Sequence, residues 1–237
     1  MPDIAPEGLP VVLIPGLTCS ARLYAEQIPA LWRCGPVTVA DHTRDDSMAA
    51  IAQRILGTAP PRFALAGLSM GGYIAFEIMR QAPERVLKLA LLDTGARADT
   101  PEQTERRQVV IALANSGRYG EIPELAFPIY VHRRRHDDEA LKRLVRTMAE
   151  ETGVAAFLRQ QAAIIGRPDS RPGLGKIACP TLVLVGEGDE ATPPELAREI
   201  AAAIPGARLT VIPNSGHLST LEEPEAVTAA LVDWMRW

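Results

Sequence analysis

The feature of this sequence that most constrains its fold is the alternation of short apolar runs with longer amphipathic segments. Several runs are apolar at consecutive positions, which is typical of strands covered on both faces of a parallel sheet. Helical segments fall between most of them, so the sequence predicts an α/β fold with a mostly parallel sheet of about six strands, flanked by helices. The six runs are LPVVLIPG, PVTVAD, RFALAGLS, LKLALLDT, TLVLVGEGD and LTVIPNSGH.

This alternation stops once, between LLDTGARADT and ACPTLVLVG. Residues 97–171 contain no convincing strand, whereas three helical segments within them end at Gly117, Gly153 and Gly166. We therefore expect a core made of residues 1–96 and 172–237, with a small helical cap inserted at 97–171. One extra helical layer of the core is the alternative.

Composition narrows the classes of partner. The chain has 237 residues, 47% of them hydrophobic, enough to bury one sizeable core. Its net charge of −4 gives no reason to expect nucleic acid or an anionic membrane as a partner. The three cysteines form no CxxC pattern, and no apolar stretch reaches membrane-spanning length. We expect a cytoplasmic protein without a disulfide framework or a thiolate metal site.

The stretch LAGLSMGG places Ser69 where an apolar strand turns directly into a helix. Gly67, Ser69 and Gly71 match G-x-S-x-G, a turn so sharp that bulky neighbours do not fit and the serine hydroxyl is held above the sheet. Ligands of parallel sheets bind at the carboxyl ends of the strands. Ser69 is thus a candidate nucleophile, with an incidental serine in a glycine-rich turn as the alternative.

A serine nucleophile needs a base and a carboxylate that orients the base. His217 follows the last expected strand and completes the chain order Ser, Asp, His, which makes it the preferred base; His42, His132 and His136 are weaker candidates. Asp189 ends the preceding strand, and consecutive strands of this kind are usually neighbours.

Other acids compete with Asp189 for this role. Asp93 also ends a strand and is its main rival, while Glu187 and Glu190 flank the preferred position. In the segment that follows, Thr192, Pro193 and Glu195 predict a helix that begins with a capping box.

Negative charge that develops on a substrate oxygen needs N–H donors. Met70 N–H lies at the expected start of a helix, and Leu17 N–H lies in the loop after the first strand, where Gly16 lets the chain turn. These two groups are the predicted oxyanion hole.

Four stretches of the chain together resemble a known family. VVLIPGL, AGLSMGGYIAFEI, VGEGDEATPPE and NSGHLSTLEEPE, in this order, are similar to the α/β-hydrolase superfamily, in particular to the branch with carboxylesterases and 3-oxoadipate enol-lactonases. The resemblance implies Ser69, Asp189 and His217 as the catalytic triad and Leu17 with Met70 as oxyanion donors. Pro15 departs from the family, which commonly has a histidine before the glycine of this loop. The family's N-terminal antiparallel hairpin is also missing, so we expect a shortened sheet.

The sequence thus predicts a serine hydrolase that cleaves a small carboxylic ester or lactone through an acyl-enzyme, without metal or organic cofactor. Thioesterases, C–C bond hydrolases and cofactor-free haloperoxidases of the superfamily share these motifs, and a ligand-binding receptor on the same fold is a further alternative. Apolar residues of the cap either line the substrate pocket or pack its helices together. These residues are Phe127, Ile129, Tyr130 and Phe157.

Overall fold

The computed structural model describes residues 8–237, and its centre is a six-stranded sheet in which every pair of neighbouring strands is parallel. The strand order is β2-β1-β3-β4-β5-β6. All six predicted strands are present. Their bounds are β1 Val11–Ile14, β2 Val37–Val39, β3 Phe63–Leu68, β4 Val86–Leu92, β5 Thr181–Gly186 and β6 Arg208–Ile212.

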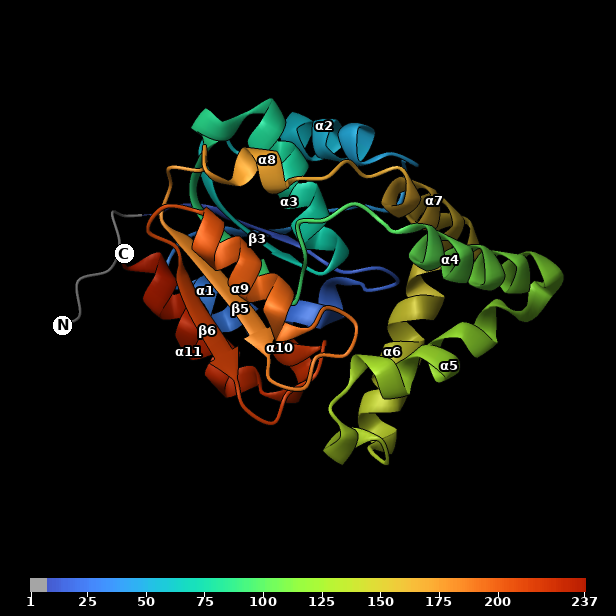
Figure 1. Cartoon of the computed structure of the whole chain (residues 1–237). Helices are drawn as coiled ribbons and strands as arrows, with labels where there is room; N and C mark the ends of the chain where they lie inside the picture. Colours follow the sequence, from blue (N-terminus) through green and yellow to red (C-terminus); the bar gives the residue numbers. More distant parts are fainter. Residues whose placement is uncertain (1–7) are drawn as a thin grey trace.

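Helices cover both faces of the sheet, and every residue of β1, β3 and β5 is buried, as their continuous apolar runs predict. On one face, α2, α3 and α9 pack against side chains such as Val12, Leu65 and Val183. On the other, α1 and α11 pack against Val11 and Ala64. Figure 1 shows α2 and α3 on one side of the sheet and α11 on the other.

The helices that cover the core have the following bounds: α1 Ile28–Leu31, α2 Met48–Thr58, α3 Met70–Gln81, α8 Arg171–Leu174, α9 Pro194–Ala203, α10 Ser219–Glu222 and α11 Pro224–Met235. Among the helices formed by residues 8–237, none combines the length and the apolar character that crossing a membrane requires.

Four α-helices lie between β4 and the short helix α8, and no strand interrupts residues 97–171, all of which the structure describes. They are α4 Pro101–Leu113, α5 Ile122–Tyr130, α6 Glu139–Thr152 and α7 Val154–Ile165. We refer to α4–α7 as the cap; Figure 1 shows them gathered beside the core, away from both termini. The division into core and cap at residues 97 and 171 remains our proposal, and residues 1–7 of the predicted core lie outside the described residues.

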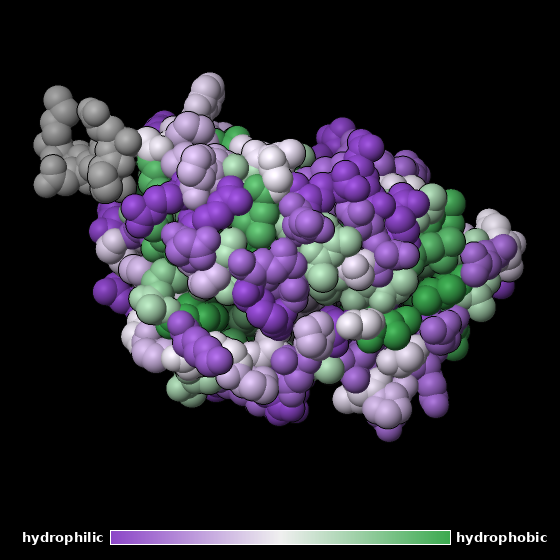
Figure 2. All heavy atoms as spheres, turned by 90° about the horizontal axis from the view of Figure 1, so that it is seen from above, coloured by the Kyte–Doolittle hydropathy of each residue, from purple (hydrophilic) through white to green (hydrophobic). Residues whose placement is uncertain are grey.

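The cap packs on the core through its apolar side chains. Phe127 of α5 and Met148 of α6 join the buried cluster that includes Leu68 and Leu218 of the core. Figure 2 shows hydrophobic surface remaining exposed at the cap end of the molecule. Since Leu68 is the last residue of β3, the packing of Phe127 and Met148 places the cap next to the loops at the carboxyl ends of the strands.

Candidate active site

Ser69 is the single residue between β3 and α3. Its backbone has φ 55° and ψ −115°, a conformation that non-glycine residues rarely adopt and that the surrounding structure must hold in place. The turn requires the neighbouring glycines: a Cβ on Gly67 would collide with the carbonyl oxygen of Gly71, and a Cβ on Gly71 would collide with that of Ile14. Glycine at these positions lets α3 begin directly against the strands.

A continuous hydrogen-bonded chain links Ser69, His217 and Asp189. The His217 Nε2 atom lies 2.8 Å from Ser69 Oγ, and its Nδ1 atom lies 2.8 Å from Asp189 Oδ2. The side chains of His217 and Asp189 are 5% and 0% exposed, so water competes little for these bonds. In the neutral ring, Nδ1 keeps its proton and donates a hydrogen bond to the carboxylate, which leaves Nε2 free to accept the serine proton.

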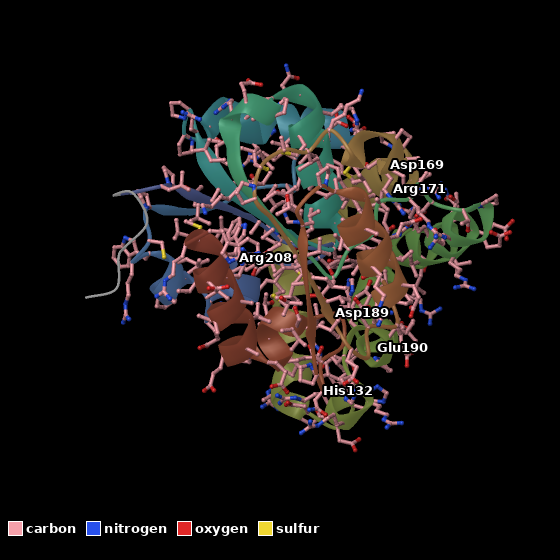
Figure 3. The ribbon with its side chains drawn as sticks, turned by 60° about the vertical axis from the view of Figure 1, so that its left-hand side comes forward. His132, Asp169, Arg171, Asp189, Glu190 and Arg208 are labelled. Carbon is pink, nitrogen blue, oxygen red and sulfur yellow. The ribbon has the colours of Figure 1, made fainter. Side chains whose placement is uncertain are left out.

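The two loops that carry His217 and Asp189 meet because β5 and β6 are parallel neighbours. Figure 3 shows Asp189 and Glu190 at one end of the sheet, on the side of His132, whereas Arg208 at the start of β6 lies toward the other end. The sequence argument from neighbouring strands therefore describes the actual geometry of these loops.

Four hydrogen bonds hold the Asp189 carboxylate. Its Oδ1 accepts from the N–H groups of Ala191 (2.9 Å) and Thr192 (2.8 Å), and its Oδ2 accepts from Thr192 Oγ1 (2.7 Å) and from His217. The predicted capping box is wrong: α9 begins at Pro194, and its N-cap residue Pro193 makes no side-chain bond. The Thr192 hydroxyl bonds to Asp189 instead.

Burial and neighbouring charges together raise the pKa values of two groups in this region, His217 and Asp93. Burial lowers the pKa of His217, but the charge and hydrogen bond of Asp189 outweigh it, so that the pKa is raised. For Asp93, burial and repulsion by Asp189 raise the pKa well above its usual value. Asp93 lies beneath the site, with Oδ1 accepting from Gly186 N–H at 2.8 Å and Oδ2 lying 2.5 Å from Ser219 Oγ. It does not contact the His217 ring nitrogens.

The two predicted oxyanion donors lie on different segments: Leu17 is in the loop after β1, and Met70 is the first residue of α3. Within residues 8–237, neither Leu17 N–H nor Met70 N–H donates to another protein atom. The loop is tied down on both sides of Leu17: His42 Nε2 lies 2.9 Å from the carbonyl oxygen of Gly16, and Thr18 N–H donates to Gln160 Oε1 of α7 at 3.2 Å.

The backbone around His217 is held by the cap and by a buried acid. The N–H groups of His217 and Leu218 both donate to the carbonyl oxygen of Tyr130, the last residue of α5, at 3.0 and 3.1 Å. The Glu222 side chain, which is fully buried, accepts from Gly216 N–H at 2.9 Å and from His132 N–H at 2.7 Å. The same carboxylate thus links the His217 loop to the segment after α5.

The remaining candidates lie elsewhere. His132 Nδ1 accepts from Arg134 N–H, and Glu187 accepts from Asn214 N–H at 3.4 Å. Sequence reasoning missed the contacts of His42, Gln160 and Glu222. Only for His42 was there a usable signal, because it follows β2 at the same edge of the sheet as Ser69.

Three adjoining cavities surround Ser69, and Leu17 and Tyr130 line all of them. Two small ones, of about 20 and 70 Å³, each have Ser69 and His217 in their walls. The third, of about 390 Å³, lies between the cap helices and the loop of Leu17, and its walls are mostly apolar. Of the cap residues considered above, Ile129, Tyr130 and Phe157 line this larger cavity, whereas Phe127 is packed in the core cluster.

Potential metal ligands do not gather in the described part of the chain: residues 8–237 hold no group of three or more His, Cys, Asp or Glu side chains placed to bind an ion. The chemistry open to Ser69 and His217 is that of a hydroxyl nucleophile with a neighbouring base.

The sequence profile of the alpha/beta hydrolase family matches residues 11–230, nearly the whole chain. This chain is an α/β hydrolase. The recognised resemblance and the predicted fold class are thereby confirmed.

Individual relatives of this α/β hydrolase differ in their reactions. A Mycobacterium tuberculosis protein assigned as the non-heme bromoperoxidase BpoC is 32% identical over 95% of this chain and 93% of its own. The structure of a thermophilic esterase from Thermogutta terrifontis matches with a TM-score of 0.88 at 32% identity, over 97% of this chain and 90% of that one. The enol-lactonase from Burkholderia xenovorans LB400 also gives 0.88 over 98% and 92%; at 24% identity this is a likeness of fold.

Proposed function

We propose that this α/β hydrolase cleaves small carboxylic esters or lactones through an acyl-enzyme on Ser69, with His217 as general base and Asp189 orienting it. The observation that carries the proposal is the buried hydrogen-bonded chain from Asp189 through His217 to Ser69 Oγ, with both links at 2.8 Å. It ends at a serine that lines two cavities. A binding protein would have no need of a serine held in a strained backbone against a base.

In the first half of the reaction, Ser69 Oγ bonds to the carbonyl carbon of the ester while its proton moves to His217 Nε2. The N–H groups of Leu17 and Met70 stabilise the negative charge on the substrate oxygen. The bond to the alcohol then breaks, and the proton on Nε2 goes to the departing oxygen. Asp189 stabilises the imidazolium in between.

In the second half, water enters and gives a proton to His217 Nε2 as its oxygen bonds to the acyl carbon. The bond to Ser69 Oγ breaks, Oγ takes the proton back, and a carboxylic acid is released. No metal ion or organic cofactor takes part in these steps. The esterase from Thermogutta terrifontis, similar over nearly the whole chain, supports ester cleavage.

Ser69→Ala tests the proposal. The variant should fold normally and lose hydrolysis of p-nitrophenyl acetate by on the order of 10³-fold or more, because the covalent route is gone. The matched control is Ser116→Ala, an exposed serine whose hydroxyl donates to the Leu113 carbonyl. A fluorophosphonate should add one label to the parent protein and to the control, detected by intact mass, and none to Ser69→Ala.

Two results would contradict this function. Near-parental turnover in Ser69→Ala would remove Ser69 from the mechanism, and a folded parent protein that resists the fluorophosphonate would indicate a receptor. A panel of p-nitrophenyl esters, lactones and acyl-thioesters of matched acyl length then separates ester cleavage from thioester cleavage, through the ratios of kcat/KM.

A further inference from the structure

Two arginines share one buried carboxylate beside the cavities around Ser69. Arg107 Nε of α4 donates to Asp99 Oδ2 at 2.6 Å, and Arg167 Nη1 contacts Asp99 Oδ1. The Asp99 side chain is only 2% exposed, and Arg167 also lies over the Tyr73 ring at 4.3 Å. One negative charge therefore faces two positive charges, and the cluster keeps a net positive charge in a largely buried position.

Arg107 is the member of this cluster that reaches the cavities. It lines the cavity of about 70 Å³ together with Ser69 and His217, and it also lines the apolar cavity of about 390 Å³ between the cap helices and the loop of Leu17. Arg167 lines neither. A molecule that extends from Ser69 into the cap therefore passes the Arg107 guanidinium.

The hydrogen bonds of Arg107 leave donors for a ligand. A guanidinium has five N–H groups. Within residues 8–237, Asp99 takes two of those of Arg107 and Gln161 Oε1 takes one, at 3.1 Å from Nη1. Two N–H groups remain without a protein acceptor. Partly buried donors of a charged group are costly to leave unsatisfied, and a carboxylate in the adjoining cavity would accept from them.

We infer that the substrate of this hydrolase carries a carboxylate in addition to its ester or lactone bond, and that Arg107 binds it. This inference rests on the proposed function and defines its substrate class: a half-ester of a dicarboxylic acid, or an ester whose alcohol part bears a carboxylate. The apolar walls of the cap cavity, which include Val110, Ile122 and Phe157, suit the hydrocarbon chain between the two groups. Asp99 and Arg167 position the guanidinium at the cavity wall.

The test compares esters that differ only in charge. In the first arm, the p-nitrophenyl half-ester of adipic acid is measured against p-nitrophenyl hexanoate, which has a methyl group in place of the carboxylate. In the second arm, the carboxylate is in the alcohol part: the hexanoate ester of 6-hydroxyhexanoic acid is measured against hexyl hexanoate. The readout is the ratio of kcat/KM for the charged and the neutral ester.

The variant is Arg107→Met. Asp99 keeps Arg167 as its partner in this variant, so no unpaired charge is left in the interior. The control is Arg143→Met on α6, an exposed arginine that lines none of the cavities around Ser69.

In at least one arm, the ratio should fall about tenfold or more in Arg107→Met, mainly through KM, and stay within about twofold in the control. Arg107→Lys should recover part of the ratio, because it keeps the charge but loses the paired N–H groups.

A second measurement does not depend on turnover. The dissociation constant of free adipate, measured by calorimetry against 1,6-hexanediol as the neutral analogue, should rise about tenfold in Arg107→Met.

The outcomes separate the two proposals. If the neutral esters are cleaved through Ser69 but neither ratio responds to Arg107→Met, the carboxylate site is wrong and the proposed function stands. If Ser69→Ala retains turnover, the proposed function fails, and the adipate measurement alone decides on Arg107. An unchanged dissociation constant in that measurement overturns the inference.

Discussion

Asp189→Asn tests how the buried carboxylate controls the protonation of His217. In the parent protein, Oδ1 accepts two backbone N–H groups, of Ala191 and Thr192, and Oδ2 accepts the Thr192 hydroxyl and the His217 Nδ1–H. Asparagine offers one oxygen and one NH₂ group in the same space, so it satisfies only one of these two sides.

The asparagine has two orientations, and both impair the base. If its oxygen stays toward the backbone N–H groups, its NH₂ donates to His217 Nδ1, and the ring proton moves to Nε2, where it blocks proton transfer from Ser69. The reverse orientation restores the tautomer but turns NH₂ toward the two N–H groups. Leaving these two N–H groups without an acceptor costs about 1–3 kcal/mol each and disfavours this orientation by about 2–6 kcal/mol. The competent form is then populated at about 10⁻² to 10⁻⁴.

We therefore expect kcat/KM for p-nitrophenyl acetate to fall about 10²- to 10⁴-fold in Asp189→Asn, with an unchanged circular dichroism spectrum. The matched control is Asp93→Asn, in which the amide can still accept from Gly186 N–H and donate to Ser219 Oγ. It should stay within about tenfold of the parent protein. Asp189→Asn activity above about a tenth of the parental value, or a larger loss in Asp93→Asn, would refute this account of the site.

Three further predictions follow from the same geometry. The kcat/KM of a neutral ester should fall with decreasing pH through an apparent pKa above about 6.5, because catalysis needs neutral His217 and Asp189 raises the pKa of that histidine. An apparent pKa below that value would show that burial outweighs Asp189. His42→Phe should lower kcat about two- to tenfold at a similar KM, since it removes one hydrogen bond to the Gly16 carbonyl, and unchanged kcat would show that the loop holds without it. Because its pKa is raised, Asp93 keeps a proton in the folded state that the unfolded state releases above pH about 4, so the free energy of unfolding of the parent protein falls as pH rises. Asparagine does not titrate, so the free energy of unfolding of Asp93→Asn, measured with urea, should rise relative to that of the parent protein from pH 5 to 8. No such relative rise would contradict the raised pKa.

The sheet was predictable because its signals are local. Continuous apolar runs bounded by Gly, Pro or Asp correspond to β1 through β6, and parallel pairing follows from the helices between them. The meeting of Asp189 and His217 followed from the same rule, since their loops leave neighbouring strands.

The parts that sequence missed either have a misleading local signal or depend on contacts between distant segments. Helix α5 was not among the three helical segments expected in the cap, because Pro128 lies within it and proline argues against a helix at that position. Thr192 precedes a helix and looks like its cap, yet its hydroxyl bonds to Asp189, because the buried carboxylate needs the donor more than the exposed helix end does. The contact of His42 with Gly16 joins residues 26 positions apart, and the place of His42 after a strand indicates the edge of the sheet but not the partner.

The connections between cap and core bear on how such an enzyme can acquire new substrates. The end of α5 holds the His217 backbone through the Tyr130 carbonyl, and Gln160 of α7 holds Thr18 next to Leu17, the proposed oxyanion donor. If the cap of a relative replaced this one, a helix would have to end where α5 ends, and a side-chain amide would have to accept from Thr18 N–H as Gln160 does. Without these two contacts, the loops of His217 and Leu17 would lose their support. Substrate range in this lineage is therefore expected to change by single substitutions on the existing helices, with the cap inherited as one unit together with the loops it supports.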